Sequence, residues 1–371
     1  MTTNQGQMTT DKPRILTGDT PTGKLHLGHY VGSLENRLAL QDQYDCYFII
    51  ANKHAFTTRA DSPDDIRQSV IDIATDYLAA GIDPVKSTIF IQSEVPAIDE
   101  LTFFFSMLIP FNRVMRNPTL AQEIKDKDLG DKYPFGFPLY AVGQCADILA
   151  FRPLLVPVGE DQLPHLELTR EVARRFDQLY CGVDPHLQDK DYVKAGGLFP
   201  VIEPKLGRVK RLVGIGPPGP DGNLLKMSKS LNNAIFLSDD ADTVQKKVMG
   251  MYTDPKRIHK TDPGETDPSK NPLWAFHETF NTDTAWVDEH RDLYKNGKVG
   301  DVAVKRKLVD VLNALIEPIR TRRKQYEQRP DEVIEVLRAG TARANAVAEE
   351  TLALAKKAMK QDYFPRELKI R

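Results

Sequence analysis

The stretch PRILTG (13–18) is a short run of β-prone residues that ends in turn residues, and it leads into the loop PTGKLHLGHYVGSL (21–34). After this loop, apolar residues keep helical spacing from about 30 to 43. A strand whose loop feeds directly into a helix is typical of the opening of a parallel, doubly wound α/β sheet. The loop holds two histidines three residues apart, His26 and His29, around the glycine Gly28.

The next residues continue this alternation of strands and helices. DCYFIIAN (45–52) and STIFIQSE (87–94) have the β-branched and aromatic character of buried strands. Between them, SPDD (62–65) is a strong helix start, because an N-cap residue and a first-turn proline precede acids at the positive end of the helix dipole. Gly81 predicts the end of that helix. The opening therefore has the order β-α-β-α-β.

The rest of the chain changes character twice. Residues 98–151 are rich in aromatic side chains and predict helices inserted between two halves of the sheet, which resumes at PLLVPV (153–158). Residues 238–360 have helical spacing and no convincing strand. We predict an α/β, Rossmann-like, doubly wound parallel sheet with a helical insertion, followed by an all-helical C-terminal domain. The expected divisions are a disordered tail (1–12), a catalytic domain (13–222), a helical domain (223–332) and a C-terminal helix that packs back (333–371).

Composition narrows the class of protein. The 371 residues are 41% apolar and 27% charged, as in ordinary globular proteins. We find no apolar run as long as a membrane span and no secretory signal, so we expect a cytoplasmic protein without a membrane segment. Cys46, Cys145 and Cys181 form no CxxC pair, which argues against a disulfide framework or a cysteine zinc site. With a net charge of −2, any nucleic-acid surface must be a local patch.

The histidine loop has the chemistry of an anion site. A loop that feeds a helix points backbone N–H groups outward, and the switch point of such a sheet binds nucleotides. Gly28 has no Cβ, so a ring or phosphate can approach the backbone closely. The imidazoles of His26 and His29 can donate hydrogen bonds to phosphate oxygens. The alternative is that both are ordinary surface or capping histidines.

A second basic motif lies far downstream in GPDGNLLKMSKSLNN (219–233). Lys226 and Lys229 stand three residues apart in a glycine-rich, exposed context, where two lysines on a mobile loop can reach negative charge as it develops. Alone, this motif could equally be a solvated basic turn. Its combination with the histidine loop on a nucleotide-binding sheet is specific.

These two motifs together resemble the class I aminoacyl-tRNA synthetases, whose hallmarks are HIGH and KMSKS. The matching stretches are HLGH (26–29) and KMSKS (226–230), and similarity to the bacterial tryptophanyl enzymes rests on GIDP (81–84), FIQSEVP (90–96), ADIL (146–149) and VPVGEDQ (156–162). The resemblance runs from about residue 14 to the C-terminal helix. It implies ATP-dependent activation of L-tryptophan to tryptophanyl-adenylate and transfer to the 3′ end of tRNA(Trp), the reaction of a tryptophan–tRNA ligase (EC 6.1.1.2).

The resemblance implies ATP with Mg²⁺ as the cofactor. The expected catalytic residues are His26, His29, Lys226 and Lys229. They would position the phosphates and stabilise their charge, since the first step needs no protein nucleophile. Mg²⁺ is expected on the phosphates, without a protein metal site. Asp161 is expected to bind the ATP ribose, with an N-cap aspartate as an even alternative. The expected ATP site comprises Thr20, Pro21, Thr22, Gly28, His29, Gly159, Glu160, Asp161, Lys226, Met227, Ser228, Lys229 and Ser230.

The expected tryptophan pocket centres on Asp147, which sits in the apolar helical stretch LYAVGQCADILAF (139–151). A buried carboxylate needs a donor, and the resemblance implies the indole N–H; a carboxylate bonded to backbone groups is the alternative. Tyr140 and Gln162 match positions that hold the α-ammonium group, and His54 matches a pocket histidine. The expected tryptophan site comprises Leu16, His54, Tyr140, Gln144, Asp147, Val156, Val158 and Gln162.

The chain departs from the bacterial pattern near both sites. Leu16 stands where many relatives have phenylalanine, and Gln144 where they have methionine. Thr20-Pro21-Thr22 replaces Gln-Pro-Ser, and Asn52-Lys53 replaces Asp-Gln. These departures leave open a divergent auxiliary synthetase paralogue with altered substrate affinity or a regulatory or binding role. A specificity for tyrosine or a modified tryptophan is a further alternative.

The resemblance also implies partners. The family reads the anticodon with its helical domain and is dimeric, with tRNA spanning both subunits. The aromatic segment 101–116 could supply an apolar homodimer interface, with core packing as the equal competitor. Candidate phosphate-binding clusters, each of which could instead be a solvated helix face, are Arg208, Lys210 and Arg211; Lys305, Arg306 and Lys307; and Arg320, Arg322, Arg323 and Lys324.

Overall fold

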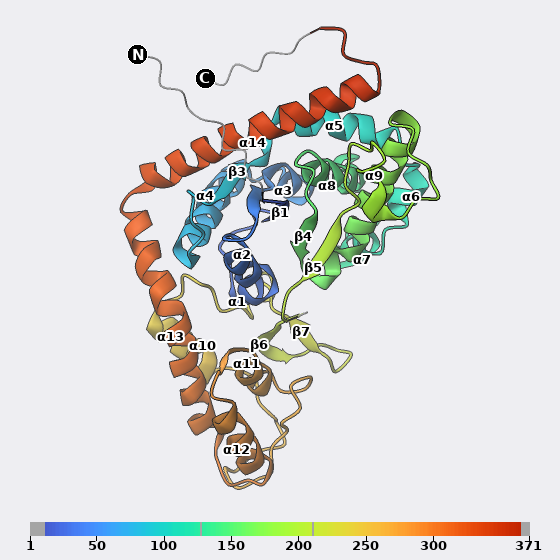
Figure 1. Ribbon diagram of the computed structural model, residues 1–371. Helices are drawn as coiled ribbons and strands as arrows, with labels where there is room; N and C mark the ends of the chain where they lie inside the picture. Colours follow the sequence, from blue (N-terminus) through green and yellow to red (C-terminus); the bar gives the residue numbers. More distant parts are fainter. Residues whose placement is uncertain (1–11, 127, 210, 365–371) are drawn as a thin grey trace.

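A five-stranded parallel sheet forms the centre of the larger of two lobes (Figure 1). The computed structural model describes residues 12–126, 128–209 and 211–364, so the predicted tail lies almost wholly outside the described residues. The strands are β1 (Arg14–Asp19), β2 (Asp45–Ile50), β3 (Ser87–Ile91), β4 (Leu155–Val158) and β5 (Glu203–Leu206). Their order is β3-β2-β1-β4-β5, and every neighbouring pair is parallel. The order reverses at β1, which confirms the doubly wound sheet and puts the switch point between β1 and β4.

Helices follow the first strands much as predicted. The chain after the histidine loop is helical but not uniform, because the five residues of the π-helical turn η1 (Tyr30–Leu34) separate α1 (Leu27–His29) from α2 (Glu35–Leu40). The short α3 (Asn52–Arg59) follows β2. The expected helix is α4 (Pro63–Ala80), which has its proline in the first turn and ends at Gly81 with φ at +114°.

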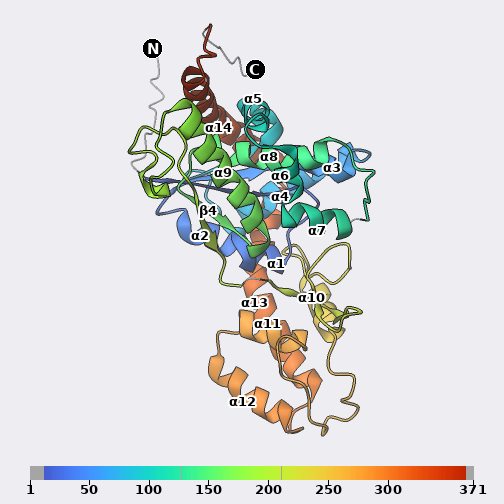
Figure 2. The same cartoon turned by 90° about the vertical axis from the view of Figure 1, so that its right-hand side faces the viewer.

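The predicted insertion is helical and covers one face of the sheet (Figure 2). It consists of α5 (Pro96–Ser106), α6 (Phe111–Met115), α7 (Pro118–Asp126) and α8 (Gly136–Leu149). After β4 comes α9 (Leu163–Tyr180), and α8 packs between α5 and α9. Among the described residues, three short 3₁₀ turns mark loop ends: η2 (Gln92–Glu94), η3 (Glu160–Gln162) and η4 (Asp189–Asp191).

The smaller lobe is helical, with one exception to the all-helical prediction. A two-stranded hairpin, β6 (Val213–Pro218) and β7 (Leu224–Lys226), joins the lobes and carries the start of the lysine motif. The expected span 223–332 therefore opens with a strand, because the tight turn at 219–223 lets the two short strands pair. The helices are α10 (Ala241–Met249), α11 (Pro272–Phe280), α12 (Thr284–Lys295), α13 (Asp301–Glu327) and α14 (Pro330–Ala358). In Figure 1, α13 rises from this lobe beside α4, and α14 crosses above β3 and α5.

The apolar core is divided by the faces of the sheet. Successive strand residues point to opposite faces, so Ile15 belongs to one cluster and Leu16 to the other. The first cluster, which we call the sheet-to-lobe cluster, continues from Ile15 and Phe48 to Trp274 and Leu312 in the helical lobe. The second lies under α5, α8, α9 and α14. Within the described residues, none of the helices combines the length and apolar character needed to cross a bilayer.

Candidate functional site

The part of the histidine loop that holds His26, Gly28 and His29, which we call the histidine turn, lies beyond the carboxyl end of β1, at the switch point of the sheet. Here the side chain of His26 caps α1: its Nδ1 accepts from the Gly28 backbone N–H at 3.1 Å. The backbone N–H of His26 in turn donates to Nδ1 of His29 at 3.2 Å, and the two ring centres are 3.8 Å apart. Because each Nδ1 accepts, a neutral ring carries its proton on Nε2. The capping alternative is thus correct for His26, and it leaves both Nε2–H groups as donors.

Both imidazoles are neutral at physiological pH. Burial, helped by the nearby His29 and Lys229, lowers the pKa of His26 to about 2. Burial also lowers the pKa of His29 to about 4, although Asp19 acts in the opposite direction. Gly28 is required by this packing, since a Cβ there would lie 2.9 Å from Cε1 of His26.

The lysine motif lies directly beside the histidine turn. Leu27 donates its backbone N–H to the carbonyl of Ile235 at 2.9 Å, and Leu237 donates to the carbonyl of Leu25 at 3.0 Å. Nζ of Lys229 lies 3.4 Å from Oγ1 of Thr22, and burial lowers the pKa of this lysine to about 8. The structure therefore brings together the two motifs that stand far apart in the sequence.

Asn233 shapes the lysine loop, and the sequence reasoning missed it. Its side chain is buried, and its Oδ1 accepts from the Ser228 backbone N–H at 2.7 Å. Its Nδ2 donates to the carbonyl of Lys226 at 3.2 Å. The hydroxyls of Ser228 and Ser230 lie 2.9 Å apart, and Met227 is buried under the loop. The asparagine lies within the quoted stretch 219–233, but no spacing rule identifies its role.

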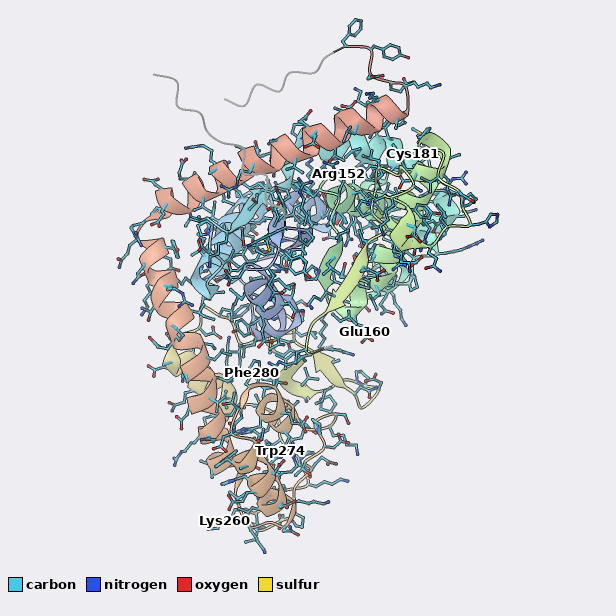
Figure 3. The ribbon with its side chains drawn as sticks, in the orientation of Figure 1. Arg152, Glu160, Cys181, Lys260, Trp274 and Phe280 are labelled. Carbon is cyan, nitrogen blue, oxygen red and sulfur yellow. The ribbon has the colours of Figure 1, made fainter. Side chains whose placement is uncertain are left out.

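The turn of Gly159, Glu160 and Asp161, which we call the acidic turn, follows β4 and lies toward the hairpin (Glu160 is labelled in Figure 3). Oδ2 of Asp161 lies 3.3 Å from Nζ of Lys226, so the turn and the lysine motif are in contact. The N-cap residue of α9 is Gln162, which excludes the N-cap alternative for Asp161. Gly159 opens the turn, and a Cβ on it would lie 2.6 Å from Oδ1 of Asp161. On the other side of the site, the Thr22 backbone N–H donates to the Thr20 carbonyl across the buried Pro21.

Asp147 is buried in α8 among side-chain partners. The amide Nε2 of Gln92 donates to Oδ1 and Oδ2 of Asp147 at 2.8 and 3.0 Å. The same amide is 3.1 Å from Nε2 of His54, which itself lies 3.4 Å from Oδ2 of Asp147. The carboxylate is therefore held by side chains from η2 and α3, and Gln92 is a pocket residue that the sequence reasoning missed.

Burial dominates the electrostatics of this pocket. It raises the pKa of Asp147 to about 7, although the Gln92 amide acts in the opposite direction. It also lowers the pKa of His54 to about 4, so that ring is neutral. A half-ionised carboxylate next to neutral partners can accept a further hydrogen bond from a donor such as an indole N–H.

The remaining predicted pocket residues line two sides. The hydroxyl of Tyr140 donates to Oε1 of Glu123 at 3.0 Å, which adds an acidic group from α7 that the sequence reasoning missed. Nε2 of Gln144 donates to Oε1 of Gln162 at 3.2 Å, so the unusual glutamine at 144 has a partner within the pocket. Three apolar side chains from two adjacent strands are buried in the same cluster as the apolar side of α8: Leu16, Val156 and Val158.

The basic clusters divide into structural and accessible residues. Arg320 and Arg323 are buried, and Arg322 donates to the carbonyl of Ala79, so the cluster 320–324 joins helices. Lys305 is buried and donates to carbonyls at the end of α10. Lys210 lies outside the described residues. Neither alternative that the sequence left open, a phosphate contact or a solvated helix face, describes these structural side chains, because they satisfy helix ends and buried carboxylates.

Comparisons with known proteins agree with this geometry. The family model described as tRNA synthetases class I (W and Y) matches residues 8–317. The tryptophan–tRNA ligase of Clostridium longisporum is 44% identical over 355 residues, covering 95% of this chain and 98% of that protein. The tryptophan–tRNA ligase of Lactococcus lactis is 46% identical over 357 residues, covering 95% and 99%.

Solved structures show the same architecture. The tryptophanyl-tRNA synthetase from Campylobacter jejuni, complexed with ADP and tryptophan, matches with a TM-score of 0.76 and 26% identity. That match covers 94% of this chain and 99% of the other. The tryptophanyl-tRNA synthetase from Mycoplasma pneumoniae has a TM-score of 0.74 at 24% identity, covering 94% and 98%, and supports the fold alone.

Proposed function

Because the chain belongs to the class I tRNA synthetases for tryptophan and tyrosine, we propose that it activates L-tryptophan with ATP and transfers it to the 3′ end of tRNA(Trp). The observation that carries this function is the contact between the histidine turn and the lysine motif at the carboxyl end of β1, where Lys226 also meets Asp161. Relatives that are 44% and 46% identical over 95% of the chain are tryptophan–tRNA ligases.

The first step joins the tryptophan carboxylate to the α-phosphorus of ATP. A carboxylate oxygen attacks, the bond to the bridging oxygen breaks, and pyrophosphate leaves with its electron pair. Nε2–H of His26 and His29 would donate to phosphate oxygens, while Lys226 and Lys229 would neutralise charge on the departing pyrophosphate. Mg²⁺ would accompany ATP on the phosphates, where it keeps much of its water. In the second step, a ribose hydroxyl of the tRNA takes the acyl group and AMP leaves.

Selection of tryptophan depends on the acceptor at Asp147. Its carboxylate would accept the indole N–H between Gln92 and His54, and Leu16, Val156 and Val158 would pack against the ring. The carboxylate of Glu123 beside Tyr140 would attract the α-ammonium group, together with Gln162. An amino acid without a donor at the indole position would leave the buried carboxylate with its Gln92 contacts alone, one hydrogen bond short, which a site of this kind penalises strongly.

Asp161 and Lys226 are expected to separate when ATP binds. The carboxylate would accept from a ribose hydroxyl, and the lysine would turn to the phosphates. Both side chains are about half exposed, so the pair costs little to break.

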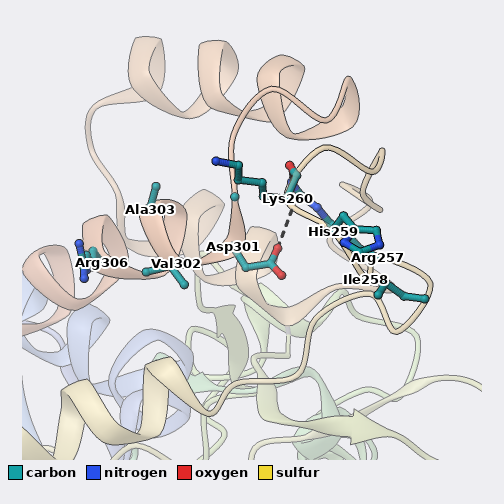
Figure 4. Close-up of a pocket in the computed structure, with 9 residues that line it drawn as sticks. Arg257, Ile258, His259, Lys260, Asp301, Val302, Ala303 and Arg306 are labelled. Carbon is teal, nitrogen blue, oxygen red and sulfur yellow. Dashed lines mark hydrogen bonds and ion pairs between the residues drawn. The ribbon is translucent and has the colours of Figure 1, made fainter.

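The helical lobe is our proposed tRNA contact. A pocket of about 400 Å³ at the far end of this lobe is lined by Lys260, His259 and Arg306 (Figure 4). Arg257 is buried there and pairs with Asp301, so it supports the pocket wall. The side chains of Lys260 and Arg306 would supply positive charge that attracts the phosphates of the tRNA.

We also propose that the enzyme is a homodimer in the cytoplasm. Phe103 lies on α5, Met107 follows the end of that helix, and Phe111 begins α6; all three are more than half exposed. Phe105, by contrast, is fully buried, so the aromatic segment supplies both core and surface. An apolar patch of this kind suits association with a second copy. Free thiols at Cys46, Cys145 and Cys181 suit a reducing compartment.

The test is ATP–pyrophosphate exchange with each of the twenty amino acids, followed by charging of tRNA(Trp). We expect exchange that depends on tryptophan, and acylation of that tRNA. Exchange with no amino acid would remove the enzyme function and favour a synthetase-like binding protein. Exchange that prefers tyrosine would instead revise the substrate.

A further inference from the structure

The carboxylate of Asp76 is not expected to touch ATP or tryptophan, yet it is hydrogen-bonded to the residue that precedes His26. Asp76, in the middle of α4, is fully buried. Its Oδ2 accepts from the backbone N–H of Leu25 at 2.8 Å, and Leu25 immediately precedes His26. Its Oδ1 is paired with NH1 of Arg323. One side chain therefore joins the histidine turn to a helix that lies 247 residues away in the sequence.

Arg323 belongs to the helix that carries the chain back from the helical lobe. It is 4% exposed and also pairs with Asp72 Oδ1 and Glu327 Oε1, each at 3.0 Å. Helix α13 begins in the smaller lobe at Asp301 and packs along α4 (Figure 1). Burial raises the pKa of Asp76 to about 6 although Arg323 acts in the opposite direction, so the carboxylate is ionised at neutral pH.

The other side of the turn is held by the segment after the lysine motif. The carbonyl of Leu25 accepts from Leu237, and the N–H of Leu27 donates to Ile235. The backbone N–H of Leu25 is thus held by a side chain of α4, and its carbonyl is held by the segment that follows the lysine motif. The position of His26 between these residues depends on both anchors, and only the first of them is a side chain that substitution can change.

We propose that Asp76 and Arg323 are positioning residues for the reaction with ATP, which hold Leu25 so that His26 and His29 meet the triphosphate. Through Arg323, the affinity for the triphosphate then depends on where α13 lies relative to α4. The inference rests on the proposed function, since it assumes that the histidine turn binds ATP phosphates. It assigns a role in phosphate binding to a pair that touches no reactant.

The primary variant is Asp76→Asn. An asparagine keeps the size of the side chain but not its charge. The Leu25 N–H therefore loses its charge-assisted hydrogen bond whichever way the amide turns, since it meets either a neutral oxygen or an NH₂ group that cannot accept. We expect the KM for ATP in pyrophosphate exchange to rise about tenfold, which corresponds to the loss of one charge-assisted hydrogen bond. The KM for tryptophan should change by less than about twofold, because the Asp147 pocket lies on α8, α3 and η2.

Asp72→Asn is the matched control. Asp72 pairs with the same arginine from the same helix, one turn earlier, whereas the Leu25 N–H donates to Asp76. Its KM for ATP should remain within about twofold of wild type. Equal changes in the two variants, or an unchanged KM for ATP in folded Asp76→Asn, would overturn the proposal.

A second variant keeps the test decisive if Asp76→Asn fails to fold. The double substitution Asp76→Leu/Arg323→Leu removes both buried charges, and such apolar replacements often retain stability. We expect a folded protein with a raised KM for ATP and a modestly lowered melting temperature, because Asp72 and Glu327 lose their arginine partner. A near-wild-type KM for ATP would contradict the positioning role.

Hydrogen exchange separates this proposal from the proposed function. The Leu25 amide should exchange faster in Asp76→Asn than in wild type or Asp72→Asn, whether or not the protein is active. Wild-type protein that lacks tryptophan-dependent exchange would refute the function. Active wild-type protein with an unaltered Leu25 amide in Asp76→Asn would refute only the positioning role.

Discussion

The carboxylate of Asp147 is the residue on which substrate choice depends. It is buried on α8, receives two contacts from the Gln92 amide, and has the neutral His54 ring beside it. Its position was predictable, because a carboxylate in an apolar helical stretch must have a donor. The role of Gln92 was not predictable, because this residue lies 55 positions away in the sequence, at the end of a strand, where no periodicity or spacing identifies a functional glutamine.

Asp147→Ala should impair tryptophan activation selectively. Loss of a buried, charged acceptor removes about 1.5–3 kcal/mol of binding, so we expect kcat/KM for tryptophan to fall roughly 10- to 100-fold. The measurement is pyrophosphate exchange with tryptophan and tyrosine. Asp147→Asn, which keeps an acceptor oxygen, is the control and should lose less. An unchanged preference for tryptophan over tyrosine in the alanine variant would refute the role of Asp147.

Tryptophan binding should weaken as the pH falls. Burial raises the pKa of Asp147 to about 7, and only the ionised carboxylate has both oxygens free to accept. The KM for tryptophan should therefore rise as the pH falls through 7 and then level off, because the protonated acid, like the amide of Asp147→Asn, keeps one acceptor oxygen. The neighbouring His54, whose pKa burial lowers to about 4, contributes nothing in this range.

Gln92→Leu tests the cause of this pH dependence. The Gln92 amide opposes the effect of burial by donating to the ionised carboxylate, so its loss should move the same rise to higher pH. The KM for tryptophan, measured from pH 5.5 to 8.5 at saturating ATP, gives the midpoint for both proteins. A midpoint that moves to lower pH in Gln92→Leu would contradict this account.

At the scale of elements, the site is made by a turn and a loop that support each other. The histidine turn is held by hydrogen bonds to residues 235–237, and the lysine loop by the buried Asn233. The helix that follows the turn passes through the π-helical turn Tyr30–Leu34 before it becomes regular. Such turns recur at functional sites, because they shift the side chains of one helical face relative to the next.

Gly28→Ala should damage the turn while a neighbouring glycine tolerates the same change. The added methyl group would lie 2.9 Å from Cε1 of His26 and displace the ring from its cap. We expect kcat/KM for ATP in pyrophosphate exchange to fall at least tenfold. Gly32→Ala is the matched control, since, apart from the adjacent residues and the backbone of its own helix, no described atom lies within 4 Å of the added methyl group. Comparable losses in both variants would point to a general helix effect.

The predictability of the elements follows their length and burial. The first four strands and α4 were visible because buried strands are apolar runs and α4 carries its own start and stop signals. The strand β5 was missed: its four residues, EPKL, include a proline and two charges and lie at the edge of the sheet. The hairpin β6–β7 was missed although its turn, PDGN (220–223), has typical turn residues, since β7 is only three residues long.

At the scale of the whole molecule, the two lobes are joined by shared core and by long helices. The sheet-to-lobe cluster runs from β1 into the helical lobe, so the expected boundary at 222/223 does not divide the core. The helices α13 and α14 return the chain from the far lobe to cover the sheet. The sequence predicted a C-terminal helix that packs back, but not the surface that it covers. The surface against which each helix packs is set by contacts between residues far apart in the chain. The periodicity within one helix cannot identify those contacts.

The exposed apolar patch on α5 and α6 predicts the oligomeric state. Phe103→Glu combined with Phe111→Glu should convert a homodimer into monomers, because two charges would be buried on each side of the interface. Sedimentation velocity measures the change. Val85→Glu, at another exposed apolar position, is the control and should remain dimeric. A monomeric wild type, or a double variant that still dimerises, would contradict this interface.

The location of the two tryptophans in the chain determines what intrinsic fluorescence can report. Trp274 is fully buried on α11, and Trp286 on α12 stacks on His290 with ring centres 3.9 Å apart. Emission therefore originates entirely from the helical lobe. Since Trp274 packs in the same continuous cluster as β1 and β2, its red shift in denaturant should coincide with the loss of ellipticity from the sheet lobe, and the enzyme should melt as one cooperative unit.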